Sequence, residues 1–205
     1  MIILGLTGSI GMGKSTAANM FRAMGVPVHD ADETVHGLLA NDGRVRAAIE
    51  ARFVGVVQSG DIDRKALGAA VFGDTAARLD LELILHPRVR LASQKFLRRH
   101  QLLNTDLVVL DIPLLYETGG EARVDAVVVV SAPAFLQRRR VLARPGMDAD
   151  KFAGILASQL PDREKRHRAD FVVETGIGKA YTFSRLKRIV TAIRNAASSG
   201  PRGTD

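Results

Sequence analysis

Eight residues near the N-terminus have the types and spacing of a phosphate-binding P-loop: Gly8-Ser9-Ile10-Gly11-Met12-Gly13-Lys14-Ser15, followed by Thr16. Glycines allow the backbone to curl around a phosphate so that its N–H groups point inward. The lysine of such a loop reaches the β- and γ-phosphates of a nucleotide, and the hydroxyl that follows it ligates Mg²⁺. These residues therefore predict a nucleoside triphosphate site formed by Gly8, Gly11, Met12, Gly13, Lys14, Ser15 and Thr16.

The residues on either side of this loop have the pattern that the chemistry requires. Residues 2–6 form a short, apolar and β-branched run that is typical of a buried strand. Residues 15–24 contain neither proline nor glycine and predict a helix, whose N-terminus would add unpaired amides and partial positive charge to the phosphate site. A glycine-rich turn that binds nothing is the alternative, and the flanking strand and helix argue against it.

Two aspartates follow the second predicted strand, residues 26–29, in which Pro27 indicates the start of a strand or an edge position. Ligands bind at the carboxyl ends of strands in a doubly wound sheet, so Asp30 and Asp32 are expected near the phosphate loop. Either carboxylate could simply cap the next helix. We favour Asp30 as the cap and Asp32 as the group that accepts the proton of an attacking hydroxyl.

A third predicted strand, residues 106–111, is a continuous apolar run that ends in Asp111. An apolar strand with a terminal aspartate has the form of a Walker B element, whose carboxylate holds Mg²⁺ directly or through water. Many buried strands end this way, so the pattern gains weight only beside a P-loop. It predicts a metal site formed by Ser15 and Asp111.

Arginines are concentrated in residues 133–168, where two helices are separated by Pro145-Gly146 and a charged run, residues 163–168, follows Pro161. Most of these arginines are predicted to lie on solvated helix faces. Guanidinium groups also bind phosphate oxygens bidentately and neutralise the charge of a transferred phosphoryl group. Arg140 and Arg144 are four residues apart, so we expect them to act together from one helix.

Residues 33–103 have an almost wholly helical pattern, which is too long for a simple crossover between two strands. This segment predicts an inserted lobe that could close over a second substrate. Helices are expected around residues 45–53, 65–72, 76–85 and 88–103, with Pro87 at the first position of the last one. His86 before it fits a cap or a packed imidazole as well as a substrate contact.

Two further strands, residues 125–131 and 169–174, complete an α/β pattern of five strands, and a C-terminal helix is predicted over residues 180–197. Residues 198–205 are rich in Ser, Gly and Pro and are predicted to be a disordered tail. A chain of 205 residues is long enough to bury a core without cross-links.

Composition excludes several classes of function. The chain contains no cysteine, which rules out disulfides, thiolate metal sites and cysteine nucleophiles. Neither a signal peptide nor an apolar run of membrane-spanning length is visible, so a cytoplasmic protein is expected. The net charge of +7 suits a nucleotide substrate or a nucleic acid, but aromatic residues are only 5%, which supplies few stacking platforms for single strands.

These residues, together with several shorter motifs, closely resemble the dephospho-CoA kinase family over nearly the whole chain. The additional matches are Asp63-Arg64 with Leu67, Leu85-His86-Pro87, Asp111-Ile112-Pro113-Leu114-Leu115-Tyr116-Glu117, Gln137 with Arg140 and Arg144, Gln159, and Ala169-Asp170. The family often has Asp-Asn after the last strand, near the adenine, where this chain has Glu174-Thr175.

The resemblance implies an α/β, P-loop, nucleoside-monophosphate-kinase-like fold: a five-stranded parallel sheet with flanking helices, an inserted helical substrate lobe and a helical lid. The expected core is residues 1–32, 104–132 and 169–197, with the lobe at 33–103, the arginine-rich lid at 133–168 and the tail at 198–205. It implies that ATP with Mg²⁺ phosphorylates the ribose 3′-hydroxyl of dephospho-CoA in a monomer or weak homo-oligomer. The implied general base is Asp32. Lys14, Arg140 and Arg144 are the implied catalytic cations, and Thr175 joins the ATP site. The implied substrate contacts are Asp32, Arg64, Leu67, His86, Pro113, Leu114 and Glu117.

Two other functions fit parts of the pattern. Another small-molecule P-loop kinase, for example for a nucleoside monophosphate, would share the phosphate loop and differ in its acceptor. A basic P-loop protein that binds nucleic acid and hydrolyses nucleotide as a switch would show affinity that falls steeply with salt. The residues alone favour a phosphoryl transferase, and only the resemblance identifies dephospho-CoA as its acceptor.

Overall fold

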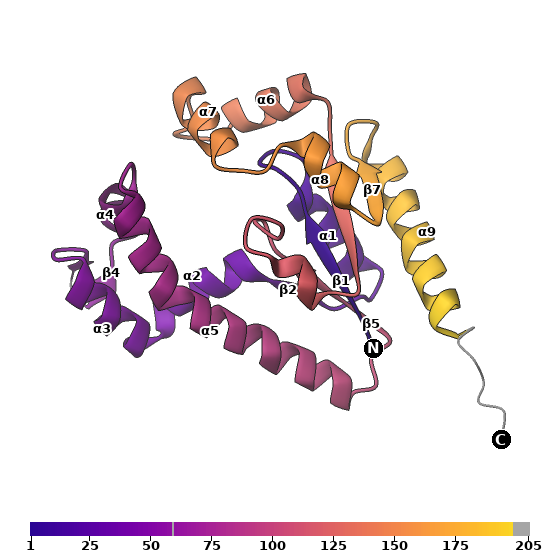
Figure 1. Ribbon diagram of the computed structural model, residues 1–205, viewed down its shortest axis with the longest axis horizontal. Coiled ribbons are helices and arrows are strands. Elements are labelled where there is room, and N and C mark those ends of the chain that lie inside the picture. The colour runs from indigo at the N-terminus through magenta and orange to yellow at the C-terminus, as the bar shows by residue number, and fades with distance from the viewer. Residues whose placement is uncertain (59, 199–205) are drawn as a thin grey trace. The chain divides into compact units, whose positions relative to one another are not determined.

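The computed structural model describes residues 1–58 and 60–198 (Figure 1). The chain separates into two compact units, one formed by Met1–His29 with His100–Asp205 and the other by Asp30–Arg99. The predicted tail falls almost entirely outside the described residues, since the last helix extends to Ser198.

A single sheet organises the first unit. Its strands are β1 (Ile2–Thr7), β2 (Val28–Asp30), β5 (Leu107–Asp111), β6 (Ala126–Ser131) and β7 (Phe171–Glu174), in the order β2-β5-β1-β6-β7. The β1–β5, β1–β6 and β6–β7 pairs are parallel, and the register places Leu6 opposite Asp111. The predicted five-stranded parallel sheet is confirmed. β2 lies at its edge, as Pro27 predicts.

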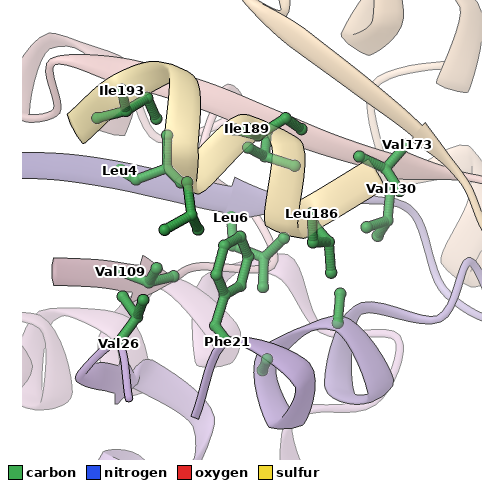
Figure 2. Packing of buried hydrophobic residues seen from close by; sticks show 14 of the residues in the cluster. Leu4, Leu6, Phe21, Val26, Val109, Val130, Val173, Leu186, Ile189 and Ile193 are labelled. Carbon is green, nitrogen blue, oxygen red and sulfur yellow. The ribbon is translucent and has the colours of Figure 1, made fainter. Parts of the chain in front are cut away.

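The core of this unit lies on both faces of the sheet. Val128 and Val130 of β6 belong to one buried cluster, and Val127 and Val129 belong to another. The first cluster is covered by α1 (Lys14–Ala23) and α9 (Lys179–Ser198), and Figure 2 shows the apolar residues of α9 packed beside Leu4, Leu6 and Phe21. Strand β6, which is apolar from Ala126 to Val130, therefore lies inside the sheet, where both of its faces are removed from water.

Three helices form the arginine-rich segment of the same unit: α6 (Ala134–Leu142), α7 (Ala149–Ala157) and α8 (Asp162–Arg168). The 3₁₀ turn η1 (Gly120–Arg123) precedes β6. Because α6 ends at Leu142, Arg144 lies beyond the helix. The prediction that Arg140 and Arg144 share one helix is therefore wrong. Proline disfavours helical geometry in the residue before it, so Pro145 prevents Arg144 from extending the helix.

The second unit is mainly helical and has its own core. It contains α2 (Ala31–Asn41), α3 (Gly43–Arg52), α4 (Arg64–Val71), most of α5 (Thr75–Leu102), and a short antiparallel pair, β3 (Val57–Gln58) with β4 (Asp61–Ile62). This small pair was not predicted, because strands of two residues carry too little alternation to be recognised. Aspartates cap three of the helices, and the buried residues include Val45, Ile49, Phe53, Val56, Leu67, Ala77 and Leu85.

Helix α5 runs without a break from Thr75 to Leu102, with Pro87 inside it. The predicted boundary between two helices at His86-Pro87 is therefore wrong. Proline removes one hydrogen bond to the carbonyl four residues earlier. That carbonyl belongs to Leu83, which is 71% exposed, so water can reach this part of the helix. Buried side chains before the proline, including Leu85, then hold the helix in register.

No helix within the described residues combines the length and the apolar character needed to cross a membrane.

Candidate active site

The glycines of the predicted phosphate loop are required by its geometry. Gly11 and Gly13 have φ angles of 77° and 93°, which side chains rarely adopt. A Cβ atom at Gly8 would lie 2.6 Å from the carbonyl oxygen of Val130, and one at Gly11 would lie 2.6 Å from Cγ2 of Val141. The loop therefore packs closely against β6 and α6, and a side chain at Gly8 or Gly11 would displace it.

The loop ends at the N-terminus of α1, where Gly13 occupies the N-cap position and no side chain caps the helix. The first amides of α1 therefore remain available to an anion, which the helix dipole also favours. Ser15 and Thr16 are exposed in this first turn. Uncapped amides next to a lysine and two hydroxyls form the phosphate site that the spacing predicts.

Lys14 and Asp111 contact each other directly. Lys14 Nζ lies 2.6 Å from Oδ1 of Asp111, whose side chain is fully buried at the end of β5. β1 and β5 are neighbours in the sheet, so the residue that ends β5 lies beside the loop that leaves β1. The lysine predicted for phosphate and the carboxylate predicted for metal thus meet at one place, in an ion pair that the sequence did not predict.

Arg140 is bound to the phosphate loop and to the residue after β7. Its guanidinium donates to Thr175 Oγ1 at 3.0 Å, to the Thr175 carbonyl at 2.9 Å and to the Gly11 carbonyl at 3.3 Å. The Thr175 hydroxyl in turn donates to the Met12 carbonyl at 2.7 Å. Arg144, in contrast, is exposed, and its side chain makes no hydrogen bond or ion pair with the residues that the structure describes.

Glu117 and Lys165 form a second ion pair, at 2.8 Å, and Glu117 also accepts a hydrogen bond from the Leu160 amide. Burial by itself would raise the pKa of Glu117, but the hydrogen bonds from Lys165 and Leu160 outweigh it and hold the pKa below its usual value. A lowered carboxyl pKa stabilises the fold above the unfolded-state pKa, and the contribution is lost as the pH falls through the folded value.

Lys165 belongs to the charged run, residues 163–168, in which solvated positions are predicted for most of the arginines, but its own side chain is fully buried. A helical turn of alternating charges gives no sign of which cation points inward. The only signal available in the sequence is the presence of an acidic partner, Glu117, which belongs to a different motif. Glu117 therefore ties α8 and the segment after α7 to the loop that follows β5.

Two other predicted substrate contacts lie in that same loop. The Pro113 carbonyl accepts a hydrogen bond from Thr7 Oγ1 at 3.0 Å, which fixes the loop to the end of β1. Leu114 is 37% exposed. A partly exposed apolar side chain on an anchored loop beside the phosphate site is available to a substrate.

The remaining predicted contacts belong to the second unit. Asp30 is confirmed as the cap of α2, because its Oδ1 accepts from the amides of Asp32 and Glu33 at 2.9 and 3.0 Å. Asp32 is exposed in the first turn of that helix. Nη2 of Arg64 lies 2.6 Å from Nε2 of His36, a residue four positions after Asp32.

Leu67 and His86 differ in exposure. Leu67 is 3% exposed within the core of the second unit, whereas His86 is exposed on α5. A direct contact between Leu67 and a substrate would need the core to open, so the leucine shapes the unit in this structure. His86 is accessible to a ligand.

Comparisons with known proteins identify the family of the chain. A family model described as dephospho-CoA kinase matches residues 2–179. A dephospho-CoA kinase of Paramagnetospirillum magneticum is 60% identical over 205 residues, which cover all of this chain and 97% of the relative. One from Mesorhizobium japonicum is 54% identical over 199 residues, which cover 97% of this chain and all of the relative.

Solved structures extend the comparison. A dephospho-CoA kinase from Campylobacter jejuni is 26% identical, covers 93% of this chain and 96% of its own, and has a TM-score of 0.61. A Thermus thermophilus protein is 37% identical, with the same shares covered and a TM-score of 0.82. Shikimate kinase from Acinetobacter baumannii, at 16% identity and a TM-score of 0.52 over 98% of this chain and 96% of its own, shares the fold.

Proposed function

The chain belongs to the dephospho-CoA kinase family, and from that premise we propose which of its residues carry out the phosphoryl transfer. The enzyme phosphorylates dephospho-CoA with ATP, the reaction that yields coenzyme A. One observation carries the assignment of the donor site: an uncapped helix N-terminus follows a loop in which the glycines at positions 8, 11 and 13 leave no room for side chains. Only a ligand that accepts hydrogen bonds from amides suits such a loop.

The donor is held by the loop and by Lys14. In our proposal the amides of the loop and of the first turn of α1 bind the phosphate oxygens of ATP, and Lys14 moves from Asp111 to the β- and γ-phosphates. Met12 and Thr16 line the same turn, and Thr175 supports it from the end of β7. Backbone groups around Thr175 would serve the adenine in place of a side chain.

The acceptor is the ribose 3′-hydroxyl of dephospho-CoA, and Asp32 receives its proton. The new bond forms between the 3′-oxygen and the γ-phosphorus, and the bond between that phosphorus and the bridging oxygen of ADP breaks. Asp32 suits this role because its carboxylate is exposed and Asp30 already caps the helix. Arg64, Leu67, His86, Pro113, Leu114 and Glu117 are proposed to bind or shape the rest of the acceptor's site.

Negative charge that develops on the transferred phosphoryl group needs nearby cations. We assign this role to Lys14, Arg140 and Arg144. Arg144 is free to approach a ligand from the segment after α6, whereas the Arg140 guanidinium already donates three hydrogen bonds to Gly11 and Thr175. Arg140 would therefore act from helix α6, and Arg144 from the segment that follows it.

The residues at the loop also fit a magnesium ion. Ser15 offers an exposed hydroxyl, and Asp111 a carboxylate at the end of the neighbouring strand, and both are the oxygen ligands that Mg²⁺ prefers. Among the described residues, no cluster of three or more acidic or histidine side chains could hold a metal alone. Ser15 and Asp111 would hold Mg²⁺, which would neutralise negative charge on the phosphates of ATP.

Turnover with a set of acceptors tests the function directly. We expect the purified protein with ATP and Mg²⁺ to convert dephospho-CoA to coenzyme A, and to leave a 3′-deoxyribose analogue of dephospho-CoA unchanged. Phosphorylation of AMP or shikimate in place of dephospho-CoA would support another small-molecule kinase. ATP hydrolysis that DNA or RNA stimulates would support the nucleic-acid alternative.

Arg140→Ala tests the role of the first arginine. We expect kcat to fall by about a thousandfold, the lower end of the effect of an arginine that stabilises a transferring phosphoryl group. Steady-state kinetics with varied ATP would separate this loss from a rise in KM. Arg139→Ala is the matched control, because Arg139 is its exposed neighbour on α6. A change confined to KM for ATP would limit Arg140 to holding the loop.

We also propose a cytoplasmic location and a monomer or weak homo-oligomer. The described residues of each unit bury their own apolar core, so neither unit requires a partner chain to form one. Light scattering at micromolar concentration would detect a stable oligomer.

A further inference from the structure

Two consecutive peptide groups of the phosphate loop, those on either side of the Ile10 Cα atom, are each held by a glutamine of the arginine-rich segment. The Ile10 amide donates to Oε1 of Gln159 at 3.0 Å. The Ile10 carbonyl accepts from Nε2 of Gln137 at 2.8 Å. Because a backbone amide only donates and a carbonyl only accepts, the two glutamines have opposite roles: Gln159 is the acceptor and Gln137 is the donor.

The contact is a built feature of the interior. Gln137 is only 6% exposed, and helix α6 approaches the loop so closely that a Cβ at Gly11 would lie 3.1 Å from the Gln137 carbonyl. Buried amide groups that lose their partners destabilise the state that contains them. The donor and acceptor of Ile10 are therefore both satisfied by side chains from sequence positions more than a hundred residues away.

Three consecutive carbonyls of the loop are held in the same manner. Gln137 binds the carbonyl of Ile10, Arg140 that of Gly11, and Thr175 that of Met12. In a trans peptide the carbonyl and the following N–H point in opposite directions. Each carbonyl that is held by one of these side chains thus directs the next amide away from it. The backbone amides of Gly11 and Gly13 donate no hydrogen bond to another of the described residues.

We propose that Gln137 and Gln159 are positioning residues for the donor phosphates. Gln137 fixes the Ile10–Gly11 peptide so that the Gly11 amide points toward the phosphates of ATP, and Gln159 fixes the preceding Ser9–Ile10 peptide. Both glutamines couple the arginine-rich segment to the loop. The proposal rests on the donor site assigned above. Neither glutamine touches the nucleotide, so both act through the backbone of Ile10.

The opposite roles of the two glutamines allow a sharp test. Gln159→Glu keeps an oxygen that accepts from the Ile10 amide, whereas Gln137→Glu removes the donor and places an oxygen against the Ile10 carbonyl. Both changes add one negative charge near the loop, so the difference between the variants reports the direction of the bond. We expect Gln137→Glu to bind ATP about tenfold more weakly than Gln159→Glu, as measured by titration calorimetry without acceptor.

A neutral pair keeps the test decisive if a buried glutamate prevents folding. Gln137→Met and Gln159→Met each remove one hydrogen bond without adding charge, and each should raise the Kd for ATP by about three- to tenfold. The Kd for dephospho-CoA should stay within twofold of the wild-type value, which a general loss of structure would not allow. Gln101→Met, an exposed glutamine of α5, is the control for the substitution itself.

Equal ATP affinities for the two glutamate variants, or unchanged ATP affinity in both methionine variants, would overturn the positioning role. Failure of the wild-type protein to bind ATP would instead count against the donor site. The two failures are distinguishable because the first is a comparison among variants and the second concerns the unaltered chain.

Discussion

Asp32→Asn is expected to reduce kcat for coenzyme A formation by about a hundredfold to ten-thousandfold, the range that general base catalysis supplies. The amide is almost isosteric with the carboxylate but cannot take the proton of the ribose hydroxyl. The Kd for ATP should be unchanged, because the donor site belongs to the loop after β1. Rapid-quench measurement of a single turnover would show whether the chemical step has slowed.

Asp32→Asn leaves the start of α2 intact, which makes the result interpretable. The cap is Asp30, whose Oδ1 accepts from the amides of Asp32 and Glu33, so the side chain of Asp32 is not needed for it. Glu33→Gln is the matched control, since it changes an exposed carboxylate in the same first turn. Near-normal turnover by Asp32→Asn would mean that Asp32 only contributes negative charge to the first turn of α2. Another group would then accept the proton of the ribose hydroxyl.

The sheet was predictable because its strands carry two independent signals. Their residues form continuous apolar runs, and they are separated by segments with helical spacing, which is the pattern of a parallel sheet covered on both faces. Pro27 indicated the start of a strand or an edge position, because proline cannot donate a hydrogen bond to a neighbouring strand, and β2 lies at the edge.

The helical unit was harder to predict in detail. A proline argues for a helix boundary from local geometry, but α5 continues through Pro87 because packing before it and solvent at Leu83 remove most of the cost. Its hairpin of two-residue strands carries almost no pattern. Where tertiary contacts determine the structure of this unit, the helix and strand propensities of its residues predict that structure poorly.

The backbone conformation of the predicted phosphate loop was predictable from its glycines, because side chains rarely adopt the φ angles of positions 11 and 13. Partners of charged side chains were not predictable in the same way. Lys165 and Glu117 lie in different motifs, and their pairing depends on how α8 packs beside the loop after β5.

The same distinction applies to the arginines and glutamines of the arginine-rich segment, residues 133–168. Spacing along the chain suggested that Arg140 and Arg144 act together, but the end of α6 at Leu142 separates them. Spacing carried no information about Gln137 and Gln159, which meet at Ile10 only in the folded chain.

Lys14→Ala is expected to have two separable effects. Removal of a preorganised cation from the transferring phosphoryl group should lower kcat/KM by about a hundredfold to a thousandfold, measured with saturating dephospho-CoA. The same change leaves the fully buried Asp111 carboxylate without the lysine that lies 2.6 Å from it. Breaking a buried ion pair costs about 3–5 kcal/mol, and we expect the free energy of unfolding in urea to fall toward this range.

A second substitution separates the two effects. In Lys14→Ala/Asp111→Asn the neutral amide no longer needs a cation, so much of the lost stability should return. The value of kcat/KM should stay at least as low as in Lys14→Ala, because Asp111 is also a proposed ligand of Mg²⁺. Lys14→Arg keeps a positive charge beside Asp111 and should retain stability, but its planar fork differs from an ammonium in how it meets the γ-phosphate. Recovery of transfer in the double variant would mean that Lys14 serves the carboxylate rather than the donor. Loss of transfer in Lys14→Arg with full stability would place the role of Lys14 at the phosphates of ATP.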